Sequence, residues 1–290
     1  MPSCNAEVVY PIEVLCEAQR SSTSSLIRAS DGCEYIVKQR SSGQSVDRDI
    51  DEWIGAAALH SLGLPVPEWA AMRMGRTFSF PSSEIAANQS AVEKQPEDLY
   101  FATRRFSAST GRQYEILPGP WFSRVTNLSD FTGVLVADLW LGKNTPRHAL
   151  FVDESETNIF KAVFINNGGL FERREMSGAR SSQQCSYIDH RVYELRQVQQ
   201  LVDCWVERIV RNSAEVISKS IESLPSLWRT RRALHCERNM AREIARLGKA
   251  AAEAASALER NQKQSMSAGS RLCFGPYTAL VDGGMMRKSA

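Results

Sequence analysis

The first third of the chain contains residues with the chemistry of a phosphate-binding cleft. A serine-rich turn comes directly before a β-prone run, and its backbone N–H groups are suited to face an anion; its candidates are Ser22, Ser24 and Ser25. Lys38 closes the following β-prone run, and Glu52 lies in the helix expected after it. A strand lysine held by a helix glutamate places a positive charge against phosphate oxygens. A solvated loop and an exposed strand-end lysine are the simpler interpretations, and local sequence leaves them open.

The elements that must position these residues can be predicted from local patterns. Two β-prone runs, residues 25–30 and 33–38, surround Asp31-Gly32, which is a strong hairpin signal. Apolar spacing predicts a helix over residues 47–62, with Gly63 at its C-terminal cap, and a strand over 68–74. The stretch 81–98 is polar and unpatterned, which predicts a long loop.

The second half of the chain is predicted to be mainly helical. The pattern indicates a buried helix over residues 131–141, a strand over 160–165, and two amphipathic helices over 192–217 and about 230–260 that are separated by Pro225. We therefore expect an α+β fold with two lobes. The strand-rich lobe is expected over residues 1–105, the helical lobe over 106–262, and a poorly ordered tail over 263–290.

Composition limits the class of protein. The chain has 290 residues, of which 43% are hydrophobic, which is enough for a sizeable core. A net charge of +2 demands neither nucleic acid nor an acidic membrane surface as a partner. The seven cysteines never form a Cys-x-x-Cys pair, which argues against a zinc site and favours a reducing compartment. Because no secretory signal and no long apolar run is visible, we expect a cytoplasmic protein without a membrane partner.

The order of several short motifs resembles the HipA-like kinases, bacterial relatives of the Ser/Thr protein kinases. The motifs that carry the resemblance run from about residue 15 to residue 250, and include Tyr35-Ile-Val-Lys38, Leu62-Gly-Leu-Pro-Val-Pro67, Phe101-Ala-Thr103, Asp138-Leu-Trp-Leu-Gly142, Arg147-His-Ala-Leu-Phe151, Phe164-Ile-Asn-Asn-Gly168 and Pro225-Ser-Leu-Trp228. The resemblance implies a two-lobed kinase fold that binds ATP and Mg²⁺. It also implies that Lys38 is the ATP-binding lysine, Glu52 its partner, and the serine-rich turn the phosphate-covering loop.

The same resemblance shows that both catalytic aspartates of the family are missing. The family catalytic loop reads Asn-Thr-Asp-x-Arg, whereas this chain has Lys143-Asn-Thr-Pro-Arg147. Without a gap, Thr145 replaces the catalytic base and Arg147 is retained; a shift by one residue places Pro146 there instead. At the second motif, Ile-Asp-x-Gly, Asn166 replaces the magnesium-binding aspartate. Neither threonine nor asparagine accepts a proton near neutral pH.

These losses lead to a main hypothesis and two alternatives. The main hypothesis is a pseudokinase-like protein with impaired phosphotransfer, weak ATP binding that does not require magnesium, and a regulatory or scaffold role through a protein partner. The first alternative is an active, atypical Ser/Thr kinase in which Asp138 or Asp153, the latter expected in a solvent-facing turn, replaces a lost acid; His148 is a further metal-ligand candidate. The second is a nucleic-acid-binding helix around Arg231, Arg232 and Arg238. The glutamates interspersed along this basic stretch, Glu237, Glu243 and Glu253, favour an ordinary solvated helix face.

Overall fold

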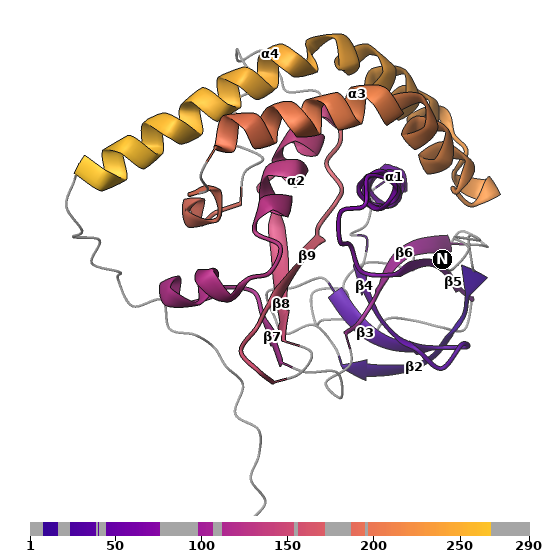
Figure 1. Ribbon diagram of the computed structural model, residues 1–290. Coiled ribbons are helices and arrows are strands. Elements are labelled where there is room, and N and C mark those ends of the chain that lie inside the picture. Colours follow the sequence, from indigo (N-terminus) through magenta and orange to yellow (C-terminus); the bar gives the residue numbers. More distant parts are fainter. Residues whose placement is uncertain are drawn as a thin grey trace, which may run out of the picture.

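The computed structural model describes residues 8–16, 24–38, 40, 45–75, 98–106, 112–153, 156–171, 187–194 and 197–267. A curved sheet forms one part of the molecule, and a second small sheet with long helices forms the other (Figure 1). This is the α+β arrangement that the sequence predicts. The serine Ser22, the predicted loop 81–98 except for its last residue, and the tail after residue 267 lie outside the described residues.

The first sheet has six strands in the order β1-β5-β6-β4-β3-β2. Its strands are β1 (Val8–Val9), β2 (Pro11–Cys16), β3 (Ser24–Ala29), β4 (Glu34–Lys38), β5 (Trp69–Met74) and β6 (Asp98–Arg104). The β3–β4 hairpin is confirmed: the strands pair antiparallel across Asp31-Gly32, and Gly32 has the positive φ of 78° that such a turn favours. In β3 buried residues (Ser25, Ile27 and Ala29) alternate with half-buried or exposed ones, so one face of this strand is buried.

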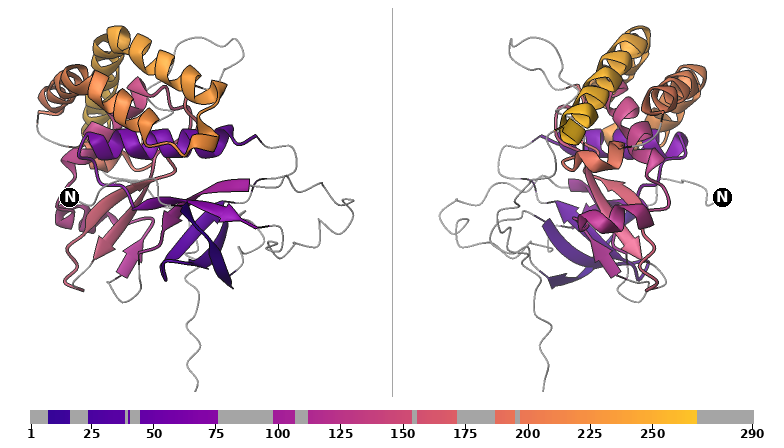
Figure 2. Two further views of the ribbon diagram at one scale, coloured as in Figure 1. Left: turned by 90° about the vertical axis from the view of Figure 1, so that its right-hand side faces the viewer. Right: turned by 60° about the vertical axis from the view of Figure 1, so that its left-hand side comes forward.

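Helix α1 (Asp47–Ser61) lies between the first sheet and the C-terminal helices (Figures 1 and 2). The predicted bounds are confirmed to within one residue. Trp53 packs edge-on against Trp69 of β5 and against Trp228, with ring centroids 6.1 Å and 5.6 Å apart. At Gly55 a Cβ would lie 2.3 Å from the carbonyl oxygen of Asn167, so only glycine allows the helix to come this close. The contact fixes α1 against the segment that follows β9.

The second sheet has the order β7-β8-β9, formed by β7 (Arg112–Tyr114), β8 (His148–Asp153) and β9 (Lys161–Ile165). A short 3₁₀ helix, η3 (Gly119–Arg124), precedes α2 (Ser129–Trp140). As its apolar sequence predicts, α2 is buried almost throughout. Phe131 of α2 packs against Phe151 of β8 and Phe164 of β9. This core places the loop after α2 beside the end of β9.

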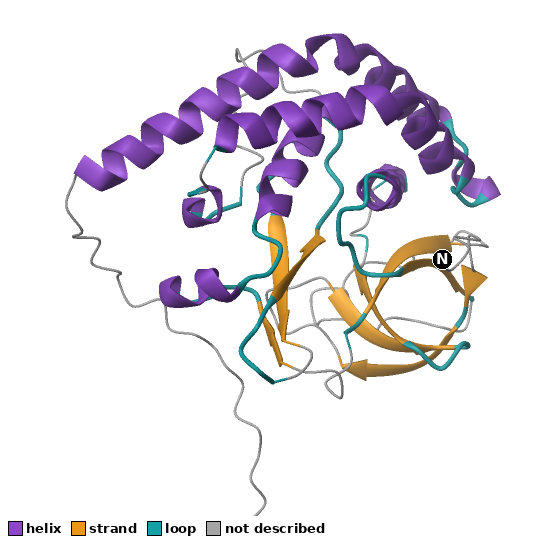
Figure 3. Cartoon of the chain, in the orientation of Figure 1, coloured by secondary structure: helices purple, strands orange, loops and turns teal. Residues whose placement is uncertain are grey.

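Two long helices run along the top of the molecule in the view of Figure 3. They are α3 (Val198–Glu222) and α4 (Arg231–Ser267). They are joined through η6 (Ser226–Trp228), as Pro225 predicts. The sequence placed the start of α3 too early, because Gln197 takes a left-handed φ of 63° and Val192 belongs to a separate 3₁₀ helix, η5 (His190–Tyr193). The predicted end of α4 was also wrong: residues 263–267 are helical. No helix in the described part of the chain is long and apolar enough to span a bilayer.

Candidate functional site

Lys38 and Glu52 form the ion pair that the sequence predicts. The distance between Lys38 Nζ and Glu52 Oε1 is 2.6 Å, and the glutamate side chain is almost fully buried. Its second oxygen, Oε2, accepts a hydrogen bond from the backbone N–H of Asn167 at 2.6 Å. Burial alone would raise the pKa of Glu52, but the Lys38 ammonium and these hydrogen bonds hold it below its usual value. Glu52 is therefore a carboxylate that fixes Lys38 in the space between the two sheets.

Asn166 lies directly after β9 and faces the same lysine. Its side-chain Oδ1 accepts a hydrogen bond from Lys38 Nζ at 2.9 Å. The residue adopts a left-handed φ of 59°, a conformation that asparagine tolerates better than most residues. Lys38 thus bridges Glu52 of α1 and Asn166, the position where the resemblance expects a magnesium-binding aspartate.

Lys143, in the loop after α2, contacts both Thr145 and Asn166, the two positions where the resemblance expects aspartates. Its Nζ lies 2.8 Å from each of three oxygens: the Thr145 hydroxyl and the carbonyls of Asn166 and Gly168. The residue is only 6% exposed. Burial, reinforced by the nearby positive charge of Arg147, lowers the pKa of Lys143 to about 8. Sequence reasoning noted Lys143 only as a replaced asparagine, and missed that it spans both motifs.

Arg147 is a positioning residue buried behind this cluster. Its guanidinium donates to both carboxylate oxygens of Asp138 in α2, with Nε 2.9 Å from Oδ2. It also donates to Asn167 Oδ1 at 2.7 Å and to the Ile165 carbonyl at 3.1 Å. Arg147 therefore ties α2 to the end of β9. Both oxygens of Asp138 are occupied by this pair, so the proposed rescue of catalysis by Asp138 has no geometric support.

Asp153 was expected in a solvent-facing turn, and this prediction was wrong. The residue is fully buried at the end of β8. Its two oxygens accept hydrogen bonds from the backbone N–H groups of Thr157 and Asn158 at 3.0 Å and 2.9 Å. Arg112 of β7 lies 3.4 Å from the same carboxylate. Asp153 closes the turn between β8 and β9.

His148 begins β8 and lies opposite Ile165 of β9. Partial desolvation, together with the positive charges of Lys143 and Lys38, lowers the pKa of His148 below its usual value. The ring is therefore neutral at pH 7. Its surroundings are positively charged, which disfavours the metal-ligand role considered from the sequence.

Ser24 and Ser25 belong to strand β3, so the predicted serine-rich turn ends before them. Ser24 lies directly opposite Lys38 in the β3–β4 ladder, and Ser25 is buried. Their phosphate-binding role remains a prediction, and the turn residue Ser22 lies outside the described residues.

A pocket of about 580 Å³ opens beside Glu52 and Asn166. Its lining includes Thr145 but not Pro146. One wall is an ion pair that the sequence did not predict: Arg232 of α4 contacts both oxygens of Asp51, at 2.7 Å and 2.6 Å. The sequence offered Arg232 only within the alternative of a nucleic-acid-binding helix, and this pairing occupies its guanidinium. Only tertiary contact reveals a pair separated by 181 residues.

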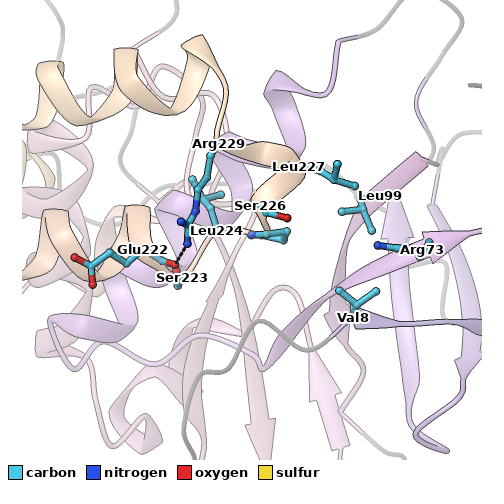
Figure 4. Close-up of a pocket in the computed structure, with 10 residues that line it drawn as sticks. Val8, Arg73, Leu99, Glu222, Ser223, Leu224, Ser226, Leu227 and Arg229 are labelled. Atoms are coloured by element: carbon cyan, nitrogen blue, oxygen red, sulfur yellow. Dashed lines mark hydrogen bonds between the residues drawn. The ribbon is translucent and has the colours of Figure 1, made fainter. Parts of the chain in front are cut away.

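A second pocket, of about 330 Å³, lies where the α3–α4 connection meets β1, β5 and β6 (Figure 4). Arg73 and Arg229 are among its lining residues, and Arg229 donates to the Glu222 carbonyl at 2.8 Å. It shares no lining residue with the pocket beside Glu52. Its lining combines charged, polar and apolar residues and matches no particular class of ligand or reaction.

The residues of the cleft do not fit the magnesium ion that the resemblance implies. A hard divalent cation requires several oxygens, preferably carboxylates, aimed at one point. Here Asn166 Oδ1 accepts from Lys38, and the carbonyls of Asn166 and Gly168 accept from Lys143. Among the described residues, no group of three or more His, Cys, Asp and Glu side chains is arranged to hold a metal ion.

No protein-family model matches the chain, and no curated protein matches it significantly. Among solved structures, it is similar to the Helicobacter pylori proinflammatory kinase CtkA, with 13% identity over 87% of this chain and 96% of CtkA and a TM-score of 0.51. It is also similar to a Golgi casein kinase with bound Mn and ADP (10% identity, 86% and 73% of the two chains, TM-score 0.49). A third is Shewanella oneidensis HipA, in complex with HipB and operator DNA (15%, 82% and 66%, 0.45).

The likeness to CtkA shows that the chain has a kinase-like fold. At 13% identity, it shows the fold alone. The two-lobed α+β architecture that the sequence predicts is therefore confirmed, and the activity has to be argued from the site.

Proposed function

We propose that this chain is a kinase-fold protein that binds a nucleotide but does not transfer its phosphate, and that it acts as a regulatory or scaffold module. The observation that carries the proposal is the intact Lys38–Glu52 pair facing Thr145 and Asn166. The pair is the part of a kinase cleft that holds phosphates. The two facing positions are those that supply the base and the metal carboxylate in an active enzyme, and here they hold neutral side chains.

The alternative of an active, atypical kinase requires another carboxylate in reach of the cleft. The two candidates from the sequence are engaged elsewhere, Asp138 by Arg147 and Asp153 by the turn after β8. Three described acids line the pocket: Glu52 is paired with Lys38 and Asp51 with Arg232, which leaves the exposed Asp47 among them. A single exposed carboxylate does not make a metal site, so this alternative is weaker than the main proposal.

Nucleotide binding is tested by calorimetry with ATP, with and without Mg²⁺, on the full chain and on Lys38→Met. We expect ATP binding that the substitution weakens by about 10-fold or more, because a charge-assisted contact to phosphate is lost. Lys161→Met, a change of an exposed lysine on β9, is the matched control and should bind as the parent does. Equal binding by parent and Lys38→Met would contradict a kinase-type cleft.

Loss of phosphotransfer is tested by restoring the acids. Thr145→Asp with Asn166→Asp returns both carboxylates, but Lys143 would then pair with them and occupy the metal position. We therefore expect the double variant to stay nearly inactive and the triple variant, with Lys143→Asn added, to gain autophosphorylation from labelled ATP. A fourth change, Lys38→Met, should abolish that gain. Clear activity in the unmodified chain would overturn the proposal.

A further inference from the structure

The donors and acceptors around the cleft are arranged for an anion. The Lys143 ammonium donates to three protein oxygens, so each of these oxygens already accepts a hydrogen bond from a cation. The hydroxyl of Thr145 accepts from Lys143, and its own hydrogen is free to point elsewhere. In Asn166, Oδ1 accepts from Lys38, which directs the Nδ2 donor away from that lysine. Thr145 and Asn166 both line the pocket.

The net charge of the ionised side chains around the cleft also favours an anion. Lys38, Lys143 and Arg147 contribute three positive charges, and Glu52 and Asp138 contribute two negative ones. The cluster therefore has a net charge of +1. With aspartates at positions 145 and 166 and an asparagine at 143, as in the family motif, the same cluster would have a net charge of −2. The first cluster attracts a phosphate directly, whereas the second requires a cation between itself and the phosphate.

Burying the charged Lys143 side chain at this position costs free energy. Removing an ammonium from water disfavours its charged form, which is why its pKa falls. Its three hydrogen bonds offset part of this cost, and at pH 7 the ammonium remains the main form. A buried cation that joins the two former aspartate positions supplies positive charge where a kinase has its metal.

We propose that the Lys143 ammonium is the resident cation of this cleft, so that the cleft takes a metal-free polyphosphate anion, such as the triphosphate of a nucleotide. Lys143 acts through Thr145 and the 166–168 backbone, which it orients, and through its charge. The inference rests on the proposed function for the nucleotide, but it makes a separate claim about the metal. Mg²⁺ neutralises part of the triphosphate charge and meets a positive cluster, so it competes with binding.

The test is calorimetry on the full chain with three probes, ATP, tripolyphosphate and adenosine, each in EDTA and in excess Mg²⁺. We expect ATP and tripolyphosphate to bind in EDTA and to lose affinity at least about threefold in Mg²⁺. Lys143→Gln replaces the ammonium by a neutral amide, which still donates hydrogen bonds but has no charge. It should weaken the binding of both anions by about 10-fold or more and leave adenosine binding unchanged. Lys161→Gln, the exposed control on β9, should not alter any probe. Circular dichroism melts show that each variant is folded.

The outcomes separate the two proposals. ATP binding that requires Mg²⁺, or that Lys143→Gln leaves intact, would overturn the resident-cation proposal but keep the nucleotide. Tripolyphosphate binding in EDTA that depends on Lys143, with no added affinity for ATP, would keep the resident cation and refute the nucleotide. Absence of binding by every probe refutes both. The triple variant Lys143→Asn, Thr145→Asp, Asn166→Asp gives a further check, because its ATP binding should now be strengthened by Mg²⁺.

Discussion

At the scale of single residues, the cleft differs at three positions from the family motifs that the sequence resembles. Thr145 and Asn166 are neutral where those motifs have aspartates, and Lys143 donates to atoms of both residues. The three differences belong together, because the Lys143 ammonium donates to the Thr145 hydroxyl and to the carbonyls of Asn166 and Gly168. Without Lys143, the backbone oxygens of Asn166 and Gly168 would lose the cation that donates to them.

The buried Asp138–Arg147 pair supports this arrangement from behind, and its removal should be costly. Arg147→Met leaves a fully buried carboxylate without its partner, so we expect a loss of about 3–5 kcal/mol in the free energy of unfolding. The double variant Asp138→Leu, Arg147→Met removes both charges and should be less destabilised than the single variant. Urea denaturation measures both. A double variant as unstable as the single one would show that the hydrogen bonds to Ile165 and Asn167 matter more than the charge.

At the scale of elements, α1 connects the cleft to the rest of the fold through three buried acids. Asp49 accepts from the backbone of Phe101 in β6, Asp51 pairs with Arg232 of α4, and Glu52 pairs with Lys38 of β4. Each acid reaches a different element. The position of Glu52, and with it that of Lys38, is therefore fixed by contacts outside the cleft.

Releasing the contact with α4 should disturb the cleft. Arg232→Met leaves the buried Asp51 carboxylate without its guanidinium, and we expect a loss of about 2–5 kcal/mol in stability. Nucleotide affinity should fall a few-fold, because Glu52 lies on the same turn of α1. Arg231→Met, which changes the exposed neighbouring arginine, is the control for both readouts. Unchanged affinity in a destabilised Arg232→Met would separate the ion pair from the cleft.

Asp49 should make the stability of the folded protein decrease as the pH rises. Burial raises its pKa to about 6, although Arg40 and the Phe101 N–H act in the opposite direction. A raised carboxyl pKa means that the folded protein holds this proton more tightly than the unfolded chain does. Its contribution is therefore complete below about pH 4 and is lost as pH rises to about 6, and it is worth up to about 3 kcal/mol. Relative to Asp49→Asn, the parent should lose stability between pH 4 and 6 in urea titrations; a constant difference would contradict this shift.

At the scale of the whole molecule, the two parts meet around Trp53. Its indole packs against Trp69, Phe101 and Trp228, and its N–H donates to Ser223 at 3.0 Å. One side chain therefore joins α1 to the first sheet and to the α3–α4 connection. Because the packing is continuous, a ligand held at Lys38 should stabilise both parts together.

Nucleotide binding should therefore appear as a single upward shift of the melting curve. ATP at 100 times its dissociation constant adds about 2.7 kcal/mol to the stability of a protein that binds it only when folded. For a chain of this size, each kcal/mol raises Tm by roughly 2–4 °C. Scanning calorimetry should show one transition that moves in the parent and in Lys161→Met, and that moves about half as far or less in Lys38→Met, whose binding is about 10-fold weaker or more. Two transitions, of which one moves, would mean that the two parts unfold independently.

Much of the fold could be predicted because its signals are local. Asp31-Gly32 specifies the β3–β4 hairpin, the apolar spacing specifies α1, and Pro225 ends α3. Strand β6 fell at the end of a polar stretch and was missed, since its partners β4 and β5 are distant in sequence. The predicted start of α3 was too early, because the apolar pattern extends back to Val192. The helical backbone begins only after Gln197, which has a left-handed conformation.

For the site, the sequence by itself predicted which chemistry is missing, because the motifs that it resembles have carboxylates where this chain has Thr145 and Asn166. It also paired Lys38 with Glu52 correctly, since a strand end and the following helix lie close in most such folds. Only the tertiary structure decided which side chain lies between Thr145 and the residues that follow β9. The contacts of Lys143 with the 166–168 backbone join segments more than 20 residues apart, and the charge of a side chain has a defined effect only when its burial and partners are known.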